Sequence, residues 1–554
     1  MRRTVMYATA AAVAMGCCTL SAQADDAAII ARIDAMQRQL EAQQQEIASQ
    51  KAEIERLRTS LKDKPRLLKA EGERTPSAPE QDFATKADVQ QLQTQLREHQ
   101  TQVRLEKQEQ PVWSVVNLRP MVQTPDGRFS VSLRGRFQLD MANHFQEEPG
   151  PLATDFRRGS VGAAQREVNS ARELSDGTNF RRAQLGVEGR FWRDFNYRLV
   201  YEFGGSGTEG PARINEAWMN YTGFAPFTIQ AGAFLPASNL DDATPTDEIL
   251  FLERATPAEL SRGLAGADGR YAAGIKGNGQ QWYASLYWTG GTVGDAENAG
   301  EQSSLVGRVA GLLLSDADFN VHAGANGSWV MEPPDQGSTV TTNRYPIRFR
   351  DRPELRVDST RLIDTGTIDA RAAHAAGLEL AANWKNFFFQ GEYFQYGIDR
   401  RANPLNEDPA FNGWYAEASW IITGETRRYN MATASFGAPK PMIPVNSDGG
   451  MGAIELAVRF SQIDLNWNEG VAGAATPVGG IRGGEQDIWT LGVNWYLNAN
   501  LRTSINYFMV DVDRLNPAGP GNTTPFGASP ATPPTGVQIG QDYDAIAIRA
   551  QFGF

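Results

Sequence analysis

Apolar and polar side chains alternate along the last segment of the chain, residues 541–554. Side chains of a β-strand point to opposite faces in turn, so Ile546, Ile548 and Phe552 share one face and Arg549 falls on the other. The alternation covers about the 9 to 11 residues that a tilted strand needs to cross a bilayer. The pattern therefore predicts a strand that separates lipid from water.

The same alternation first occurs at residues 127–141, where Leu133 and Leu139 face away from Arg134 and Arg136. A core strand of a soluble protein could not bury such charges unpaired, so the polar face must meet water or a channel. The alternation recurs in segments 179–204, 214–221, 227–235, 269–276, 281–288, 305–314, 319–330, 370–384, 387–396, 414–423, 452–461, 489–497 and 501–510.

With 179–204 taken as a hairpin, these segments predict about 16 strands, and an even number lets a barrel close with both ends on one side. The predicted fold class is all-β, a transmembrane antiparallel β-barrel over residues 111–554, preceded by an N-terminal α-helical coiled coil. Short joints at 384–386 and 497–500 predict turns at one end of the barrel, and the long joint at 516–540 predicts a loop at the other.

The N-terminus is typical of a secretory signal. Arg2 and Arg3 precede an apolar stretch, and Ala22 and Ala24 mark a cleavage site, which predicts a signal peptide at residues 1–24. Both cysteines, at positions 17 and 18, fall inside it, so the exported chain has no disulfide and no cysteine metal site. A lipoprotein signal with a lipidated Cys17 is the alternative.

Residues 25–64 carry an apolar residue at every seventh position, including Ile33, Leu40 and Ile47. This period predicts a coiled coil, with a lone amphipathic helix on a protein surface as the alternative. Prolines interrupt the pattern in a predicted linker at 65–84, and the spacing resumes in a second short coiled-coil helix at 85–110. The heptad run within this segment, residues 29–61, is about 50 Å long at about 1.5 Å per residue. It could tether a barrel to peptidoglycan or another periplasmic partner.

Patterns of catalytic and metal-binding residues do not occur in the sequence. The 4 histidines, at positions 99, 144, 322 and 374, lack ligand spacing, and we find no Gly-rich phosphate loop or nucleophile elbow. The triplet Asp364-Thr365-Gly366 alone is weak evidence for an aspartic protease. We therefore expect no enzyme, no metal and no cofactor. A net charge of −12 argues against nucleic acid as a partner.

Several segments resemble the phosphate-selective porin O and P family of outer-membrane channels. The resemblance rests on Phe180-Arg181-Arg182 within residues 180–186 and on runs at 251–254, 352–354, 364–366, 413–415, 423–426, 452–456 and 492–497. The terminal Phe554 is similar to the signature by which bacterial outer-membrane barrels are recognised for assembly.

This resemblance implies a homotrimer in the outer membrane of a Gram-negative bacterium, surrounded by outer-membrane lipid, with the coiled coil in the periplasm. It also implies a lumen that is narrowed by an inward-folded third loop. Arginines and lysines that carry inorganic anions, such as phosphate or polyphosphate, would line this lumen.

Individual arginines can be assigned to the lumen by the same alternation. The candidates for the anion path are Arg134, Arg136, Arg182, Arg190, Arg198, Arg308, Arg459 and Arg549. Guanidinium groups in a lumen could pass an oxyanion along by successive bidentate contacts. Alternatively, these arginines only brace the wall by pairing with lumen carboxylates, namely Glu188, Glu202, Glu379, Glu392, Glu417 and Glu455.

The predicted third loop, residues 236–265, is acidic and has no lysine, whereas a phosphate filter needs positive charge at its narrowest point. We therefore expect passive diffusion of small anions with a mild preference, and the alternatives are a general diffusion porin or a structural tether. If the acids reach the constriction, neutralising two of them should raise phosphate affinity. The constriction candidates are Asp241, Asp242, Glu253, Arg254 and Arg262.

Overall fold

A computed structural model describes residues 86–116, 119–148, 150, 155–157, 173–205, 213–266, 269–293, 299–316, 318–401, 407–517 and 534–554. The chain divides into two compact units, Met1–Arg97 and Glu98–Phe554. The predicted signal peptide, first coiled coil and linker lie outside the described residues, and their boundaries stay predictions. Within the described part, no helix combines the length and the apolar character needed to span a membrane.

Helix α2, Lys86–Glu109, lies where the sequence predicts a second short helix. Three residues of its predicted seam are exposed: Val89 at 40%, Leu92 at 65% and Leu96 at 56%. A partner helix would cover such an apolar seam. The helix is confirmed, whereas the coiled coil stays a prediction.

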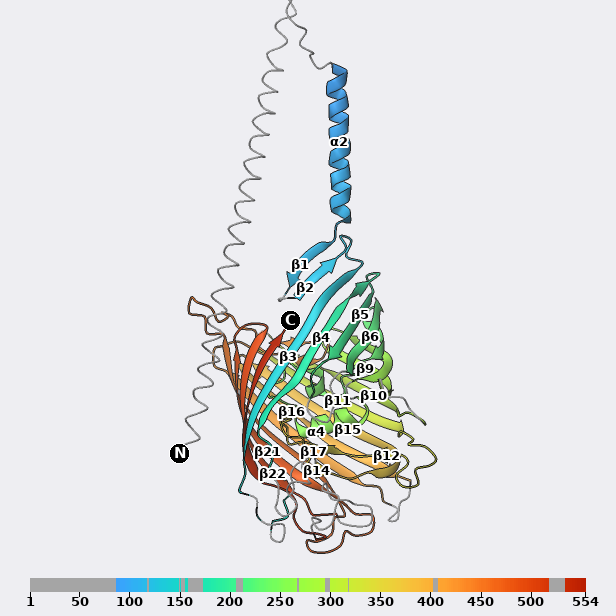
Figure 1. Cartoon of the computed structure of the whole chain (residues 1–554), viewed down its shortest axis with the longest axis vertical. Helices are drawn as coiled ribbons and strands as arrows, with labels where there is room; N and C mark the ends of the chain where they lie inside the picture. Colours follow the sequence, from blue (N-terminus) through green and yellow to red (C-terminus); the bar gives the residue numbers. More distant parts are fainter. Residues whose placement is uncertain are drawn as a thin grey trace, which may run out of the picture. The chain divides into compact units, whose positions relative to one another are not determined.

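Sixteen strands of the described chain form the closed antiparallel barrel that the sequence predicts (Figure 1). The barrel closes where β23 pairs with β3, from Asp544 opposite Phe145 to Gly553 opposite Arg136. Its strands are β3 (Ser130–Phe145), β4 (Gly177–Phe191), β5 (Phe195–Glu202), β6 (Arg213–Phe224), β7 (Phe227–Ala233), β8 (Arg270–Asn278), β9 (Trp282–Thr292), β10 (Ser303–Ser315), β11 (Phe319–Glu332), β15 (Ile368–Trp384), β16 (Phe387–Arg400), β17 (Ala410–Ile421), β20 (Ala453–Trp467), β21 (Ile481–Tyr496), β22 (Leu501–Asp513) and β23 (Tyr543–Gly553).

The outer face of the barrel is apolar, as the alternation predicts. Val131, Leu133 and Met141 of β3 are 39%, 50% and 56% exposed. An apolar wall with a girdle of aromatic rings is the surface that a membrane barrel presents to lipid. Near the short turns such rings lie close together, in the pairs Phe129–Trp192 at 5.3 Å, Phe195–Tyr221 at 4.8 Å, Phe227–Trp282 at 6.1 Å and Phe387–Trp420 at 5.9 Å.

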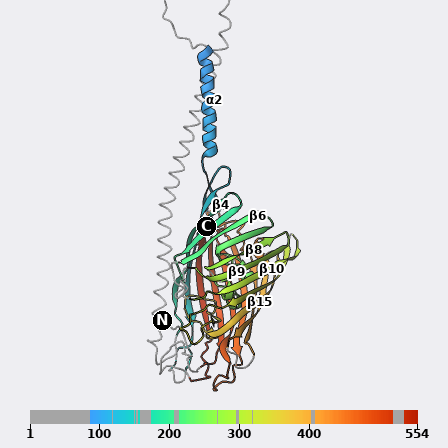
Figure 2. The same cartoon turned by 90° about the vertical axis from the view of Figure 1, so that its right-hand side faces the viewer.

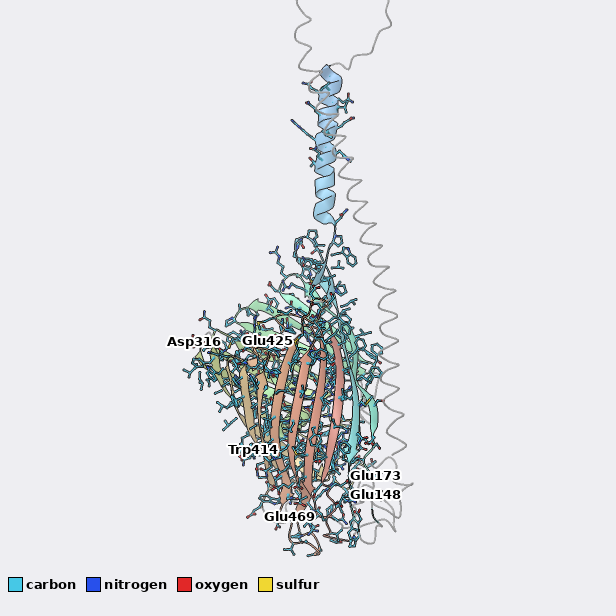
Figure 3. The ribbon with its side chains drawn as sticks, turned by 90° about the vertical axis from the view of Figure 1, so that its left-hand side faces the viewer. Glu148, Glu173, Asp316, Trp414, Glu425 and Glu469 are labelled. Atoms are coloured by element: carbon cyan, nitrogen blue, oxygen red, sulfur yellow. The ribbon has the colours of Figure 1, made fainter. Side chains whose placement is uncertain are left out.

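The two ends of the barrel differ in their joints. Residues 385–386 and 497–500 are short joints between neighbouring strands, as predicted. We call the end of the barrel that carries these two joints the short-turn end, and the other end the long-loop end. Figure 2 shows β8, β9 and β10 following one another around one wall. Figure 3 separates the ends, with Asp316 and Glu425 at the short-turn end, Trp414 on the wall, and Glu148, Glu173 and Glu469 at the long-loop end.

A two-stranded ribbon precedes the barrel and was not expected from the sequence. It consists of β1 (Val112–Val116) and β2 (Arg119–Gln123), which pair with each other. β2 also pairs with the start of β3, with Met121 opposite Ser132. The ribbon uses the part of β3 that extends past the end of β23. Each strand has five residues, and alternation over so few residues does not distinguish a strand from a loop.

The joint between β7 and β8 folds into the barrel, as the family resemblance implies (Figure 1). It contains helices α3 (Leu240–Ala243) and α4 (Thr256–Ala265), and we call residues 234–269 the third loop. Its apolar side chains join a buried core with the wall. The joint 333–367 adds β12 (Pro346–Ile347), β13 (Arg350–Asp351) and β14 (Ile363–Asp364), and the joint 422–452 adds β18 (Tyr429–Asn430) and β19 (Ser435–Phe436).

Replacing Phe554 by serine should lower the yield of assembled barrel. Phe554 exchanges two backbone hydrogen bonds of 3.0 Å with Gly135, and its ring lies where a Cβ on Gly135 would approach within 2.5 Å. Gly135→Ala should therefore also reduce assembly. The matched control is Gly307→Ala, because a Cβ there meets no atom closer than 3.6 Å. The heat-modifiable fraction on electrophoresis of outer membranes measures the yield, and wild-type levels for Phe554→Ser would contradict the prediction.

Deleting residues 25–110 should leave a barrel that still folds, because all sixteen strands follow this segment. Heat modifiability in detergent and the β-signal in circular dichroism test this expectation. The full-length chain is the control. A truncated chain that never becomes heat-modifiable would mean that barrel folding depends on the N-terminal segment.

Candidate functional site

The third loop is held in the lumen through its main-chain carbonyl groups. Arg502 on β22 donates to the carbonyl oxygens of Ile249, at 2.6 Å, and Leu250, at 3.0 Å. Arg459 on β20 donates to the carbonyl of Glu253 at 3.1 Å. Inward-facing arginines at these positions therefore satisfy loop carbonyls that water would otherwise solvate.

Two acidic residues of this loop, Asp241 and Asp242, are neutralised within the loop itself. Asp241 lies 3.2 Å from Arg254, and Asp242 lies 2.9 Å from Arg262. All four residues are buried. Asn239 also caps α3 by accepting from the Asp242 amide. The interpretation that these acids set the sign of the constriction is therefore not favoured, because they are committed to internal ion pairs.

Glu253 is the ion-pairing centre between this loop and the rest of the barrel. Its carboxylate accepts two hydrogen bonds from Arg181, at 2.8 and 3.1 Å, and one from Arg549, at 2.8 Å. Arg356, from the joint 333–367, lies 3.3 Å away. Three guanidinium groups from three separate parts of the chain thus share one buried carboxylate. Removing the carboxylate would leave all three partly unpaired.

Three of the predicted anion-path arginines brace the wall instead. Arg308 is bound to Glu379 at 2.9 Å, and Arg549 to Asp140 at 2.6 and 2.7 Å. Arg459 pairs with Glu354. These arginines are 1–3% exposed. For them, the alternative of ion pairs with lumen carboxylates describes the structure better than direct contact with a permeating ion.

The inner wall has a covered half and an open half. On β15–β23, inward residues such as Ile398, Glu455 and Asn506 are 0% exposed, because the inward-folded joints pack against them. On β3–β6, by contrast, the side chains of Arg134, Arg198 and Glu216 keep exposures of 17%, 26% and 23%. Space for water and ions is therefore expected along β3–β8.

The open half carries more positive than negative groups. Glu188 is shared by Arg119 at 2.8 Å, Arg198 at 3.0 Å and Arg134 at 3.4 Å. A single carboxylate cannot balance three guanidinium groups. Arg198 also contacts Glu216 at 3.1 Å, and Arg136 pairs with Asp247 of the third loop.

Three cations of this half have no carboxylate partner among the described residues. Arg182 donates to the Gln138 side-chain oxygen at 2.7 Å, and Arg190 donates to Asn196 at 3.3 Å. Lys276 on β8 is half-buried and faces the same side. Unpaired cations in a lumen are the groups available to contact an anion.

A β-bulge places Arg181 beside Arg182. Gln138 on β3 lies opposite Arg182, whereas Leu139 lies opposite Phe180, so β4 holds one extra residue at this point. Bulges redirect side chains in this way. Strict alternation assigns Arg181 to the lipid face, which is why the sequence identified Arg182 and missed its neighbour.

A polar cleft of about 420 Å³ lies between α4 and the joint 333–367. Glu259 and Asp351 are the acids of its lining. Both face Arg356, at 2.9 and 3.9 Å. Four of its arginines, Arg348, Arg350, Arg356 and Arg361, belong to the joint 333–367, which follows no period, so the cleft could not be predicted from the sequence. The fifth, Arg270, begins β8.

Comparisons with known proteins find a matching family and several relatives. The model of a family described as phosphate-selective porin O and P matches residues 159–529. The chain is 25% identical to Porin O of Pseudomonas aeruginosa over 71% of this chain and 86% of that protein. It is also 25% identical to an uncharacterised protein of Caulobacter vibrioides, over 72% of each chain. An anion-selective porin from Comamonas acidovorans superposes with a TM-score of 0.42 and 13% identity, covering 77% of this chain and 100% of that one.

Proposed function

We propose, because the chain belongs to the phosphate-selective porin O and P family, that it is an outer-membrane channel for passive diffusion of small oxyanions such as phosphate or polyphosphate. The family indicates a channel rather than an enzyme. The observation that carries the choice of anions is Arg182, which faces the open half of the lumen without a carboxylate partner among the described residues. The homotrimer implied by the resemblance stays part of this proposal.

An anion would pass three groups of cations in turn. The arginines of the cleft would concentrate it at the long-loop end, since a low-dielectric wall focuses positive potential. Arg182 and Arg136 would contact it beside the third loop, and Arg134 with Arg198 would contact it nearer the short turns. Partial pairing of Arg134 and Arg198 with Glu188 keeps the anion's contact with these two arginines weak enough for the ion to leave, which conduction requires.

Planar-bilayer recording of the full-length channel tests this function. In a gradient of potassium chloride the reversal potential should indicate anion preference, and added phosphate should reduce the chloride current. A cation-selective reversal potential would reject an anion channel. Anion preference without competition by phosphate would instead favour the general diffusion porin.

Anion preference should decrease as the pH rises from 6 to 8, because of Asp351 in the cleft. Burial, together with nearby Glu259, raises the pKa of Asp351 to about 7, although Arg356 opposes this shift. Below that pH the side chain is neutral and the cleft is more positive; above it the carboxylate offsets one arginine. Reversal potentials in chloride, which does not titrate, measure the effect.

Two variants separate Asp351 from other loop acids. Asp351→Asn should abolish the pH dependence and keep the low-pH preference. Asp335→Asn is the matched control, because a hydrogen bond from Arg344 lowers the pKa of Asp335 to about 2, far below the tested range. An unchanged pH profile in Asp351→Asn would contradict this role.

A further inference from the structure

The β1–β2 ribbon has one apolar face that points to the same side as the lipid-facing wall. Val131 of β3 lies opposite Val122 of β2, which in turn lies opposite Trp113 of β1. Directly opposed residues of antiparallel strands project to the same side. Since Val131 lies on the outer face of the barrel, Trp113 and Val122 project to that outer side as well.

This outer face of the ribbon is open and uncharged. Trp113 is 75% exposed and Val115 is 69% exposed. The other positions on this face are Pro120 and Val122, so no charged side chain interrupts it. The opposite face is mixed, with Val112 and Met121 beside Ser114, Gln123 and Arg119, and Arg119 turns back to Glu188 at 2.8 Å.

The ribbon continues the aromatic girdle of the barrel. Phe129, two residues before Val131, stacks edge-on against Trp192 at 5.3 Å. The guanidinium group of Arg128 lies 6.0 Å from the Trp192 ring centre, and Asp126 forms an ion pair with it. Exposed tryptophan in an aromatic girdle suits the headgroup level of a membrane.

We infer that the outer face of the ribbon rests in the phospholipid headgroup layer at the short-turn end of the barrel. Trp113 and Val115 enter the layer, and the ribbon thereby extends membrane contact past the last residue of β23. The continuity with the aromatic girdle of the barrel favours lipid over a second copy of the chain. The inference uses the outer-membrane location and not the choice of permeating ion.

Fluorescence quenching in vesicles tests the inference. The full chain with Cys17→Ser and Cys18→Ser receives a single cysteine by Trp113→Cys, labelled with a polarity-sensitive dye in vesicles of phosphatidylethanolamine and phosphatidylglycerol. Lipids spin-labelled at the headgroup should quench this dye about as strongly as one at Val131→Cys. Val112→Cys, on the opposite face and 43% exposed, should be quenched mainly by aqueous iodide. Val115→Cys is a second reporter in case the Trp113 variant folds poorly.

Two results would overturn the inference. Quenching at positions 113 and 115 by iodide alone would place the ribbon in water. Protection from both quenchers, together with disulfide cross-linking between copies at position 113, would make this face a subunit contact. Heat modifiability confirms in each case that the variant is folded. Conductance is a separate readout, so failure of the proposed anion selectivity would leave the lipid-quenching result intact.

Discussion

Replacing Arg182 by glutamate is expected to shift the channel from anion toward cation preference, changing the permeability ratio by about tenfold, or about 1.4 kcal/mol. Among the described residues, Arg182 has the Gln138 side-chain oxygen as its hydrogen-bond partner and forms no ion pair. A reversed charge in a narrow, low-dielectric lumen is weakly screened and acts on every passing ion. Reversal potentials in planar bilayers measure the shift.

The matched control is Arg190→Glu on the same strand. Arg190 is exposed and equally free of a carboxylate partner among the described residues, but screening by salt should make its effect smaller. Arg182→Lys should keep the preference for anions. If Arg182→Glu kept wild-type selectivity while Arg190→Glu altered it strongly, the narrow part of the ion path would not lie at Arg182.

Replacing Glu253 by alanine is expected to lower the free energy of unfolding by about 3 to 5 kcal/mol, the usual cost of breaking a buried ion pair from one side. Arg181, Arg356 and Arg549 would lose their shared carboxylate. The third loop would also lose its tie to β4, so single-channel conductance should become larger or less steady. Denaturant unfolding in detergent and single-channel recording measure the two effects.

Glu173→Ala is the control for this substitution, because Glu173 is an exposed acid at the long-loop end (Figure 3). It should change stability little. A Glu253→Ala barrel with the stability and conductance of the wild type would show that the carbonyl contacts alone hold the loop.

The strands were predictable because membrane and lumen impose opposite polarity on neighbouring residues. All sixteen predicted strands overlap observed ones, and the closing strand at 541–554 corresponds to β23, Tyr543–Gly553. The ribbon and the short elements of the inward joints were not predictable, since a few residues carry no period. The inward position of the third loop followed from family resemblance rather than from its own sequence.

The candidate site was predictable only where a residue follows the alternation. Arg182 was identified in this way. Arg502 lies at an inward position of a predicted strand, so the alternation could have identified it too. Arg181 was hidden by the bulge, and Arg356 lies in the joint 333–367, which follows no period. Whether an inward arginine is paired depends on segments distant in sequence, as Glu354 is for Arg459, so the pattern could not separate bracing from conducting residues.

The barrel wall binds the third loop mostly through the peptide oxygens of the loop. Arg502 donates to the carbonyls of Ile249 and Leu250, and Asn494 also donates to the Leu250 carbonyl at 2.9 Å. Every residue type has the same peptide oxygen, so these hydrogen bonds do not depend on which side chains the loop carries. Side chains outside the ion pairs can therefore be exchanged while the loop keeps its course. Pores of different specificity could therefore evolve, or be engineered, by substitutions in this one loop while the barrel stays the same.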